Sequence, residues 1–378
     1  MSRSEGRRDA RPEDLGPEWG REKKPSAIKR IFTIFFRTVL VLMETVLLVA
    51  MLLYGVMYVV AKGPSPTARD LFVMSVRETS AIGFLANLFF TDEEIAQIES
   101  SKKDVDYVET DTSLININTE TTSPESGGQS SADAWGLVDE DGDGIILQPV
   151  KGEGFSGFMM VVLDPSRVIM GSVPSSYGRE AYTVEQMVKK FDAVAGINAG
   201  GFEDEGGMGD GSIPDSLVVV DGQVYYSGSG YGQGGGFVGF DSNYIMHVGR
   251  PTVAEIKEKD IRYGVCFGPV LVSNGEPVDP DSLGSGLNPR TAIGQRSDGA
   301  VLLLVIDGRQ VISMGATYQD LVDIMLEYGA VNACNLDGGS SSLMWFDGGY
   351  VNNCASVVGI RPVPTTFLVL KEGASANG

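Results

Sequence analysis

The feature that most constrains this chain is one uninterrupted apolar stretch near its N-terminus. It runs from Thr38 to Ala61 and reads TVLVLMETVLLVAMLLYGVMYVVA. A helix needs about 20 mostly apolar residues to cross a bilayer, and this stretch is long enough. Glu44, the one ionisable residue inside it, lies in the first turns, where it can stay neutral or reach the headgroups. The stretch is apolar on every side and too long for a signal peptide, and no clear cleavage site follows it. We therefore predict a transmembrane helix over 38–61.

The charges around this helix predict its direction. Several basic residues precede it, whereas few follow it before the chain becomes mostly acidic. Those before it are Arg21, Lys23, Lys24, Lys29, Arg30 and Arg37, and those just after it are Lys62 and Arg69. Because basic flanks stay in the cytoplasm, we predict a cytoplasmic basic tail over 1–37 and an extracytoplasmic location for everything after Lys62. The chain would then be a single-pass protein of the cell membrane.

The next part of the chain is predicted to be helical and then flexible. Residues 62–110 have apolar side chains at helical spacing, which predicts a juxtamembrane helical hairpin, and Thr91 with Glu94 forms a capping-box pattern inside it. The apolar face of this hairpin would rest on the membrane or on a partner helix. Residues 111–134 are polar and rich in serine and threonine, which predicts a flexible linker. We place a folded domain over 135–378.

Composition excludes several classes of function. The formal net charge of −21 argues against a nucleic-acid partner, because phosphate backbones are bound by clustered lysine and arginine. The single histidine, His247, leaves almost no material for histidine metal sites or for a Ser-His-Asp triad. The cysteines lack Cys-x-x-Cys spacing, and a bridge between Cys334 and Cys354 is left open by their spacing. We expect no cofactor and no metal at the functional site.

The acidic run DEDGDG, Asp139–Gly144, opens like the calcium loop of an EF-hand. The twelfth loop position is Val150, where that motif requires a bidentate glutamate, and no helix pattern flanks the run. We interpret it as an acidic turn before the strand GIILQPV. A calcium-dependent adhesive module built on Asp139, Asp141 and Asp143 is the alternative.

The rest of the domain alternates short strands with short helices, and glycine is abundant, at 49 residues. The segment SLVVVDGQVYYSG predicts a hairpin around Asp221-Gly222. Two other segments have the pattern of a capped helix followed by a strand, the first beginning at Thr183 and the second at Thr317. We therefore predict an α+β fold with mixed β-sheets, short helices and glycine-rich loops at strand ends.

The two helix–strand units resemble each other where their strands end. In the first, GINAGGF places Asn198 before Gly200–Gly201, and in the second, NLDGGSSS places Asn335 before Gly338–Gly339. The second copy adds Asp337, which can act as an acid, a base or a nucleophile. Paired glycines let backbone amides approach an anion closely. One such loop is an ordinary turn, whereas two matching loops predict a site built between them.

Arginine and carboxylate residues near these loops could supply chemistry. Arg290 in NPRTAIG and Arg361 in GIRPVP are candidate phosphate ligands, although a surface ion pair is the plainer interpretation of each. Ser340 lacks the G-x-S-x-G context of a serine hydrolase, and DGGSSS lacks the lysine of a P-loop. Asp337 is the best candidate for one member of a carboxylate pair of the kind used in glycoside hydrolysis. The candidates for its partner are Asp307, Glu203, Asp204 and Asp210.

A set of motifs occurring in this order resembles the phosphodiester glycosidase family: GINAGGF, NPRTAIG, VLLLVIDGR, NLDGGSSSLM and IRPV. The resemblance covers residues 183–370 and implies hydrolysis of a sugar-1-phosphodiester with release of the sugar. The family often has phenylalanine where Gly201 stands, which would widen the pocket here, and a third glycine where Ser340 stands, which would add a hydroxyl. The matching residues implied to line the site are Asn198, Gly200, Gly201, Phe202, Arg290, Asp307, Asn335, Asp337, Gly338, Gly339 and Arg361.

The expected mechanism places anion-binding groups and carboxylates around one substrate. Arg290 and Arg361 would hold the phosphodiester with help from the Gly338–Gly339 amides. Asp337 would act at the anomeric carbon or on the attacking water. A phosphate is already a good leaving group, so a strong general acid is unnecessary. The second carboxylate is expected to be Glu203 or Asp307.

Residues and resemblance together predict a membrane-anchored, extracytoplasmic hydrolase of cell-surface or exopolysaccharide metabolism. Its substrate would be a sugar phosphodiester or a surface glycopolymer. The alternative is a non-catalytic protein that binds or assembles surface polysaccharide. The reaction product distinguishes the hydrolase from the binding protein, because only a hydrolase releases a reducing sugar and a phosphate monoester.

Overall fold

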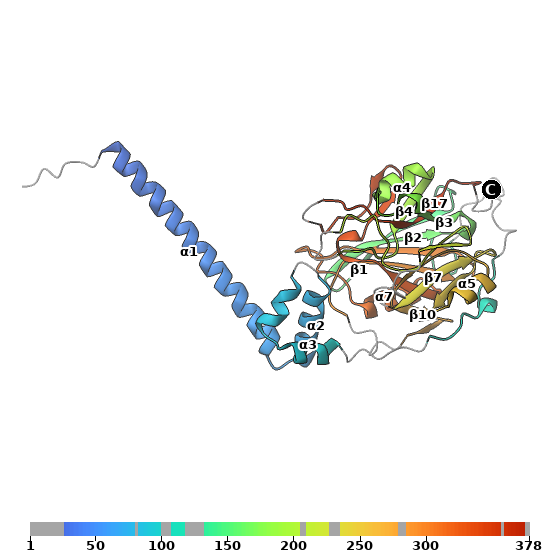
Figure 1. Cartoon of the computed structure of the whole chain (residues 1–378), viewed down its shortest axis with the longest axis horizontal. Coiled ribbons are helices and arrows are strands. Elements are labelled where there is room, and N and C mark those ends of the chain that lie inside the picture. Colours follow the sequence, from blue (N-terminus) through green and yellow to red (C-terminus); the bar gives the residue numbers. More distant parts are fainter. Residues whose placement is uncertain are drawn as a thin grey trace, which may run out of the picture. The chain divides into compact units, whose positions relative to one another are not determined.

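The computed structural model describes residues 26–79, 82–99, 107–117, 132–204, 209–226, 235–278, 285–356 and 359–374 (Figure 1). The chain divides into two compact units, Met1–Val59 and Val60–Gly378. Most of the predicted basic tail lies outside the described residues.

The first unit consists of most of one long helix. Helix α1 spans Ala27–Lys62 and contains the whole apolar stretch predicted from the sequence. It is long and apolar enough to cross a membrane, and its large apolar side chains are exposed along its length. A helix of this length and composition near the N-terminus is a membrane anchor or a signal sequence.

The second unit begins with short helices that pack on one another. Helix α2 spans Pro66–Arg77, η1 spans Gly83–Leu88 and α3 spans Asp92–Glu99. The predicted capping box is confirmed, because the Thr91 N–H donates to Glu94 Oε2 at 2.9 Å and the Glu94 N–H donates to Thr91 Oγ1 at 3.2 Å. The buried residues of α2 are apolar: Val73, Met74 and Val76.

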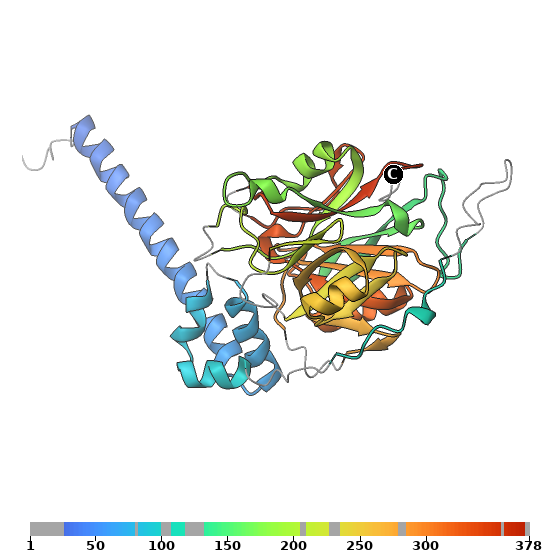
Figure 2. The ribbon, with the colours of Figure 1, turned by 45° about the vertical axis from the view of Figure 1, so that its right-hand side comes forward.

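Three antiparallel sheets form the body of the second unit (Figure 2). The largest has seven strands in the order β1-β2-β13-β12-β14-β10-β11. Its strands are β1 (Ile145–Gly152), β2 (Phe155–Val162), β10 (Val270–Ser273), β11 (Glu276–Pro277), β12 (Arg290–Arg296), β13 (Val301–Ile306) and β14 (Ala330–Leu336). Every residue of β13 and β14 is buried. Successive side chains of a strand point to opposite faces, so both faces of this part of the sheet are covered.

The other two sheets have five strands each. One has the order β16-β15-β4-β17-β3 and the other has the order β6-β5-β9-β7-β8. The first is built from β3 (Val168–Ser172), β4 (Ala193–Asn198), β15 (Met344–Phe346), β16 (Gly349–Tyr350) and β17 (Thr365–Leu370). The second is built from β5 (Val218–Val220), β6 (Gln223–Tyr226), β7 (Gly236–Asp241), β8 (Met246–Gly249) and β9 (Ile261–Phe267).

Short helices connect and cover these sheets. They are α4 (Val184–Lys190), α5 (Val253–Glu258) and α7 (Tyr318–Glu327), with the 3-10 turns η2 (Thr112–Leu114), η3 (Pro165–Arg167), η4 (Pro174–Ser176) and η6 (Gly339–Ser341). Helix α4 packs against β4, and α7 packs against β14 and β10. Thr183 and Thr317 cap α4 and α7, as predicted, and each forms a reciprocal capping box with the third helical residue.

The predicted α+β fold is confirmed, and so are its local signals. The hairpin turn at Asp221-Gly222 has positive φ angles of 49° and 75° at these residues. The described chain before 135 also packs on the body: the Asn116 N–H donates to Ser297 O at 2.7 Å. Of the predicted linker, residues 118–131 lie outside the described residues.

Candidate functional site

The two strand ends singled out in the sequence meet in space. Strand β4 ends at Asn198 in a five-stranded sheet, and β14 ends at Leu336 in the seven-stranded sheet. The Asp337 N–H donates to Ala199 O at 2.9 Å, and the Asn198 side-chain amide donates to Asp337 O. The loop that carries Asp337 is therefore fixed where two sheets come together.

The Asn198 side chain is hydrogen-bonded at this junction through both its nitrogen and its oxygen. Its side-chain oxygen accepts a hydrogen bond from Thr291 Oγ1 at 2.9 Å and another from the Leu343 N–H at 3.1 Å. The residue is fully buried. A buried amide that is hydrogen-bonded through both its nitrogen and its oxygen fixes backbones in place. Asn198 therefore positions the Asp337 loop.

Asp337 carries a half-buried carboxyl group whose pKa is unusual. Burial raises the pKa of Asp337 to about 7, and the negative charge of Asp215 adds to the rise. The Ser341 side chain, the Gly338 N–H and the charge of Arg361 act in the opposite direction, because they favour the ionised form. A carboxyl group with this pKa can gain and lose a proton near neutral pH.

Asp215 is a site residue that sequence reasoning missed. It lies just before β5, half-buried, and its N–H donates to Gly201 O at 3.2 Å. A Cβ atom placed on Gly201 would lie 2.6 Å from Asp215 Oδ2 and 3.0 Å from the Phe267 ring. The space that the missing side chain leaves is thus filled by a carboxylate and an aromatic ring. It does not widen the pocket as the sequence suggested.

The glycines after Asp337 are required by close backbone contacts. A Cβ on Gly338 would lie 2.9 Å from Pro289 O, and Gly339 has a φ of 61°, which favours glycine. The Gly339 N–H donates to Pro289 O at 2.9 Å, and the Gly338 N–H bonds to the Asp337 carboxyl. Both amides therefore have partners within the protein. Ser340 follows them, half-buried, in η6.

Asp307 lies at the end of β13, and both oxygens of its carboxylate accept hydrogen bonds from the protein. Oδ1 accepts hydrogen bonds from Asn352 Nδ2 at 3.1 Å and from the Asn353 N–H at 2.9 Å, and Oδ2 accepts one from Asn353 Nδ2 at 3.1 Å. The residue is 4% exposed. This aspartate anchors the loop at 352–353.

Glu203 and Arg361 lie on the Gly201 side of the site. The Glu203 side chain is exposed. Arg361 pairs with Asp204 through both terminal nitrogens, at 2.9 and 2.7 Å, and its guanidinium stands over the Phe202 ring at 4.9 Å. The Arg361 charge reaches Asp337, where it favours the ionised carboxylate. Phe202 and Asp204 thus hold the guanidinium in place.

Arg290 is buried and paired with a residue from the juxtamembrane helices. Its Nη2 donates to Glu78 Oε2 at 2.8 Å and to Gly286 O at 2.7 Å, and the guanidinium stacks on Tyr318 with 4.2 Å to the ring centroid. Only 6% of the Arg290 side chain is exposed. The Glu78 carboxylate also accepts a hydrogen bond from Asn288 Nδ2 at 2.8 Å. The C-terminal end of α2 is thus built into the surroundings of the site.

Arg309 is the second residue that sequence reasoning missed. It follows Asp307-Gly308 with a φ of 57°, and its side chain lies over Gly339, where a Cβ would be 3.2 Å from Nη2. That nitrogen donates to the neutral acceptors Thr79 Oγ1 at 2.9 Å and Asn288 Oδ1 at 3.1 Å. Partial burial and the nearby Arg290 charge lower the pKa of Arg309. Arg309 is thus an exposed cation close enough to Asp337 for their charges to interact, and its side chain is hydrogen-bonded to the neutral groups of Thr79 and Asn288.

Asn335 lies in β14, one residue before Leu336, and is buried. Its side-chain amide donates to Gly268 O at 2.7 Å, and its backbone N–H donates to Pro269 O at 2.9 Å. Among the residues that the structure describes, its side-chain oxygen has no hydrogen-bond partner. These contacts join β14 to the loop that leads into β10.

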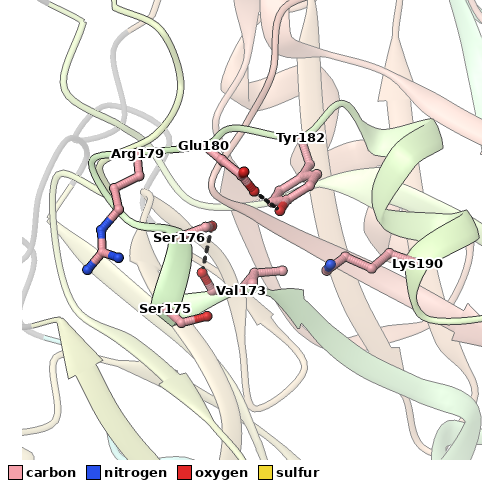
Figure 3. A pocket seen from close by; sticks show the side chains of 7 residues that line it. All are labelled: Val173, Ser175, Ser176, Arg179, Glu180, Tyr182 and Lys190. Atoms are coloured by element: carbon pink, nitrogen blue, oxygen red, sulfur yellow. Dashed lines mark hydrogen bonds between the residues drawn. The ribbon is translucent and has the colours of Figure 1, made fainter.

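A small polar pocket lies on another part of the body (Figure 3). Its volume is about 280 Å³, and it is lined by Val173, Ser175, Ser176, Arg179, Glu180, Tyr182 and Lys190. Figure 3 shows the Tyr182 hydroxyl directed at Glu180, to which it is hydrogen-bonded at 2.5 Å. None of its lining residues belongs to the Asp337 loop or to the residues around it.

Other polar groups noted in the sequence have structural surroundings. Asp139, Asp141 and Asp143 form an acidic turn in which Asp139 accepts the N–H groups of Gly142 and Gly144, both at 2.9 Å. No helix flanks this turn among the described residues. His247 is buried and lies 3.0 Å from Asp241. All three cysteines are free, so the Cys334–Cys354 bridge is not formed.

Comparisons with known proteins agree with this architecture. Residues 191–370 match the phosphodiester glycosidase family. A SPbeta prophage-derived uncharacterised protein of Bacillus subtilis, YomE, is 34% identical over 197 residues, which is 50% of this chain and 29% of that protein. The chain thus spans less than a third of this relative's length.

A solved structure shows the same fold. It is the catalytic domain of zebrafish N-acetylglucosamine-1-phosphodiester alpha-N-acetylglucosaminidase, described as auto-inhibited by its pro-peptide. The two structures superpose with a TM-score of 0.50 at 20% identity, covering 60% of this chain and 82% of the zebrafish domain. Residues 191–370 of this chain thus form a domain similar to those of the phosphodiester glycosidase family.

Proposed function

We propose that this protein hydrolyses a glycosyl phosphodiester, cutting the bond between the sugar C1 and a phosphate oxygen. The observation that carries the proposal is the Asp337 carboxyl group, with a pKa of about 7 beside the accessible cation of Arg309. A proton-transfer group works best when its pKa lies near the working pH. A neighbouring guanidinium is the natural receptor for a phosphodiester.

The reaction assigns one role to each group. Ionised Asp337 takes a proton from a water molecule as the water oxygen bonds to C1. The C1–O bond breaks, and the phosphate oxygen leaves with the electron pair as a phosphate monoester. Arg309 holds the anionic phosphate and stabilises the charge that builds on the leaving oxygen.

Asp215 supports the proposal as the second carboxylate. Glu203 is exposed and Asp307 accepts three hydrogen bonds from Asn352 and Asn353, whereas Asp215 is half-buried, accepts a hydrogen bond from Ser216 Oγ at 2.8 Å and raises the pKa of Asp337. The Asp215 charge would also stabilise positive charge that develops on the sugar ring. Arg290 and Arg361 already form ion pairs with Glu78 and Asp204. We therefore assign them a supporting electrostatic role and no direct hydrogen bond to the phosphate.

The proposed location is the outer side of the cell membrane. Helix α1 would be a single-pass anchor, with the basic segment before it in the cytoplasm and the second unit outside. A sugar phosphodiester or a surface glycopolymer is the substrate that such a location would present. The specific sugar and aglycone are decided by assay.

The test uses the full chain in detergent and a panel of glycosyl-1-phosphodiesters that includes UDP-N-acetylglucosamine. We expect release of a reducing sugar and a phosphate monoester by the parent, and loss of release in Asp337→Asn and Arg309→Ala. Arg179→Ala, at an exposed arginine on the Figure 3 pocket, is the matched control and should keep parental turnover.

A protein that binds surface glycopolymer without cutting it is the second candidate. It is favoured by the pairing of Arg290 and Arg361 with carboxylates, which leaves fewer free cations than the sequence suggested. Retention of intact polymer with no sugar released from any member of the panel would establish this binding role and reject the hydrolase.

A further inference from the structure

A short turn after Arg309 exposes an apolar surface at the site. In the segment RQVISMG, Val311 is 103% exposed, Ile312 is 81% exposed and Met314 is 55% exposed. Lone exposed apolar side chains are common, but a group of large ones at one tip marks a surface that contacts another apolar phase.

This turn is firmly held in its conformation. Gln310 and Ser313 exchange backbone hydrogen bonds at 2.9 and 3.2 Å, which closes the turn around Val311 and Ile312. The Ser313 hydroxyl donates to Asp307 O at 2.7 Å, and the Met314 N–H donates to Gly154 O at 2.8 Å. The two aliphatic side chains are therefore presented by a rigid support and cannot easily fold back.

The turn begins at the residue proposed to hold the phosphate. Arg309 lies two positions before Val311, and its guanidinium is hydrogen-bonded to Thr79 at the end of α2. A ligand held by Arg309 would therefore have its aglycone end close to an apolar tip. Such a tip suits a hydrocarbon chain and does not suit a water-soluble aglycone such as a nucleoside.

A second exposed apolar surface lies on the short helices beside α2. Ile82, Phe84 and Leu88 are 39%, 62% and 54% exposed. The same helices reach back to the end of the long apolar helix, because Lys62 Nζ stands 4.4 Å from the Phe90 ring centroid. These side chains are thus close to the point where α1 ends.

The length of the segment between the end of α1 and the end of α2 limits the distance between the site and the end of α1. Helix α2 has 12 residues, which corresponds to about 18 Å at about 1.5 Å per residue. The few residues between Lys62 and Pro66 add at most about 14 Å. The step from Arg77 to Glu78 and Thr79 adds at most about 7 Å, so these residues, which bond Arg290 and Arg309, lie within about 40 Å of the end of the apolar helix.

We propose that the Val311–Ile312 turn and the η1 surface rest in the outer face of the bilayer, and that the substrate is a lipid-linked glycosyl phosphodiester. This inference rests on the proposed hydrolase function and on α1 as an anchor. The substrate is a sugar joined through C1 and one phosphate to a long-chain alcohol. Water adds at C1, the C1–O bond breaks, and the products are free sugar and a lipid phosphate monoester that stays in the membrane.

The experiment compares two esters with the same reacting bond. One glycosyl phosphate is supplied in two forms, as a water-soluble methyl ester and as a polyprenyl ester. Both are assayed with vesicles of phosphatidylglycerol and phosphatidylethanolamine that carry the full-length protein and, in the second case, the polyprenyl ester. We expect the polyprenyl ester to be cleaved about tenfold faster or more, because the bilayer concentrates substrate beside the turn. Val311→Asp with Ile312→Asp should remove this advantage and leave the methyl-ester rate unchanged.

The control is Val253→Asp, which adds one aspartate at a 38% exposed valine on α5, away from the turn, and should change neither rate. Insertion is measured separately with Ile312→Trp, whose extra emission should be quenched by lipids brominated near the headgroup. Equal rates for the two esters, or an unquenched tryptophan, would overturn the lipid inference while leaving the hydrolase intact. Cleavage of neither ester would overturn both.

Discussion

Two strand ends with the same Asp-Gly sequence lie on either side of β12, and their aspartates have different surroundings. At the end of β13, Asp307 accepts three hydrogen bonds from Asn352 and Asn353 and is 4% exposed. At the end of β14, Asp337 is half-buried, bonded to Ser341 and Gly338, and close to another negative charge. The two carboxyl groups therefore differ in their hydrogen-bond donors and nearby charges although both follow the same Asp-Gly pattern.

The largest expected effect tests the chemical half of this comparison. Asp337→Asn keeps the shape of the side chain and removes the proton acceptor. We expect turnover to fall by about 10²–10⁴-fold, the range for loss of a positioned acid–base group. Unchanged circular dichroism would show that the fold is intact, and parental turnover in this variant would remove Asp337 from the mechanism.

The anchoring half is tested by stability. Asp307→Ala would remove an acceptor from the buried Asn352 side chain and two hydrogen bonds from the exposed Asn353, at a cost of about 1.5–3 kcal/mol in the free energy of unfolding. This cost is measured by denaturant titration, from the unfolding transition of the unit Val60–Gly378. An Asp307→Ala protein with parental stability would show that the loop at 352–353 does not depend on the carboxylate.

A somewhat smaller effect is expected where α2 meets the site. Glu78→Gln removes the negative charge beside Arg290, which is 6% exposed, and should lower the free energy of unfolding by about 1–3 kcal/mol. The matched control is Glu99→Gln, because Glu99 pairs with Arg77 at the surface, where both side chains are about 40% exposed. Surface pairs contribute about 0–1 kcal/mol, so equal losses in the two variants would contradict a special role for Glu78.

Stability against pH sharpens the comparison further. The unfolded Asp337 side chain titrates near about 3.9, whereas the folded one titrates at about 7, so between these values the folded state binds a proton that the unfolded state does not. Stability from this group therefore falls as pH rises through that window. Melting temperatures measured from pH 4 to pH 8 should show the Asp337→Asn variant becoming more stable relative to the parent as pH rises. A difference in melting temperature that stays constant over this range would contradict the raised pKa.

The smallest effect concerns Asp215. Ionised Asp337 is the active form, so kcat/KM should rise with pH to a plateau above about 7. Asp215→Asn removes a charge that raises the pKa of Asp337, so the midpoint of this rise should move to lower pH. A merely structural role for Asp215 would lower the plateau and leave the midpoint in place. A profile that falls above pH 7 would instead make Asp337 a general acid.

Sequence patterns predicted the elements of this fold well because their signals are local. The Thr183 and Thr317 caps, the Asp221-Gly222 turn and the buried strands depend on neighbouring residues. The meeting of the Asn198 and Asp337 loops was also predictable, from the likeness of the two units. Three antiparallel sheets were less accessible, because pairing partners are far apart in the chain.

The partners of the site residues could not be predicted from local patterns. Glu78 meets Arg290 across 212 positions of sequence, and Thr79 meets Arg309 across 230. Asp307 and Asp337 both end a buried strand and precede a glycine, and this shared pattern does not reveal which distant groups surround each carboxyl. Asp215 follows a proline in an irregular segment, so no periodic pattern marks it. Such roles depend on tertiary contacts, which a single sequence does not display.

The missing side chain at Gly201 has a consequence for how this protein can change over generations. A Cβ there would lie 2.6 Å from Asp215 Oδ2 and 3.0 Å from the Phe267 ring, so a larger residue at 201 requires these side chains to move, whereas position 215 can change while Gly201 stays. A descendant that acquires a larger residue at 201 is therefore expected to have lost or relocated the acidic group at 215 first. This order of change would distinguish lineages of the protein.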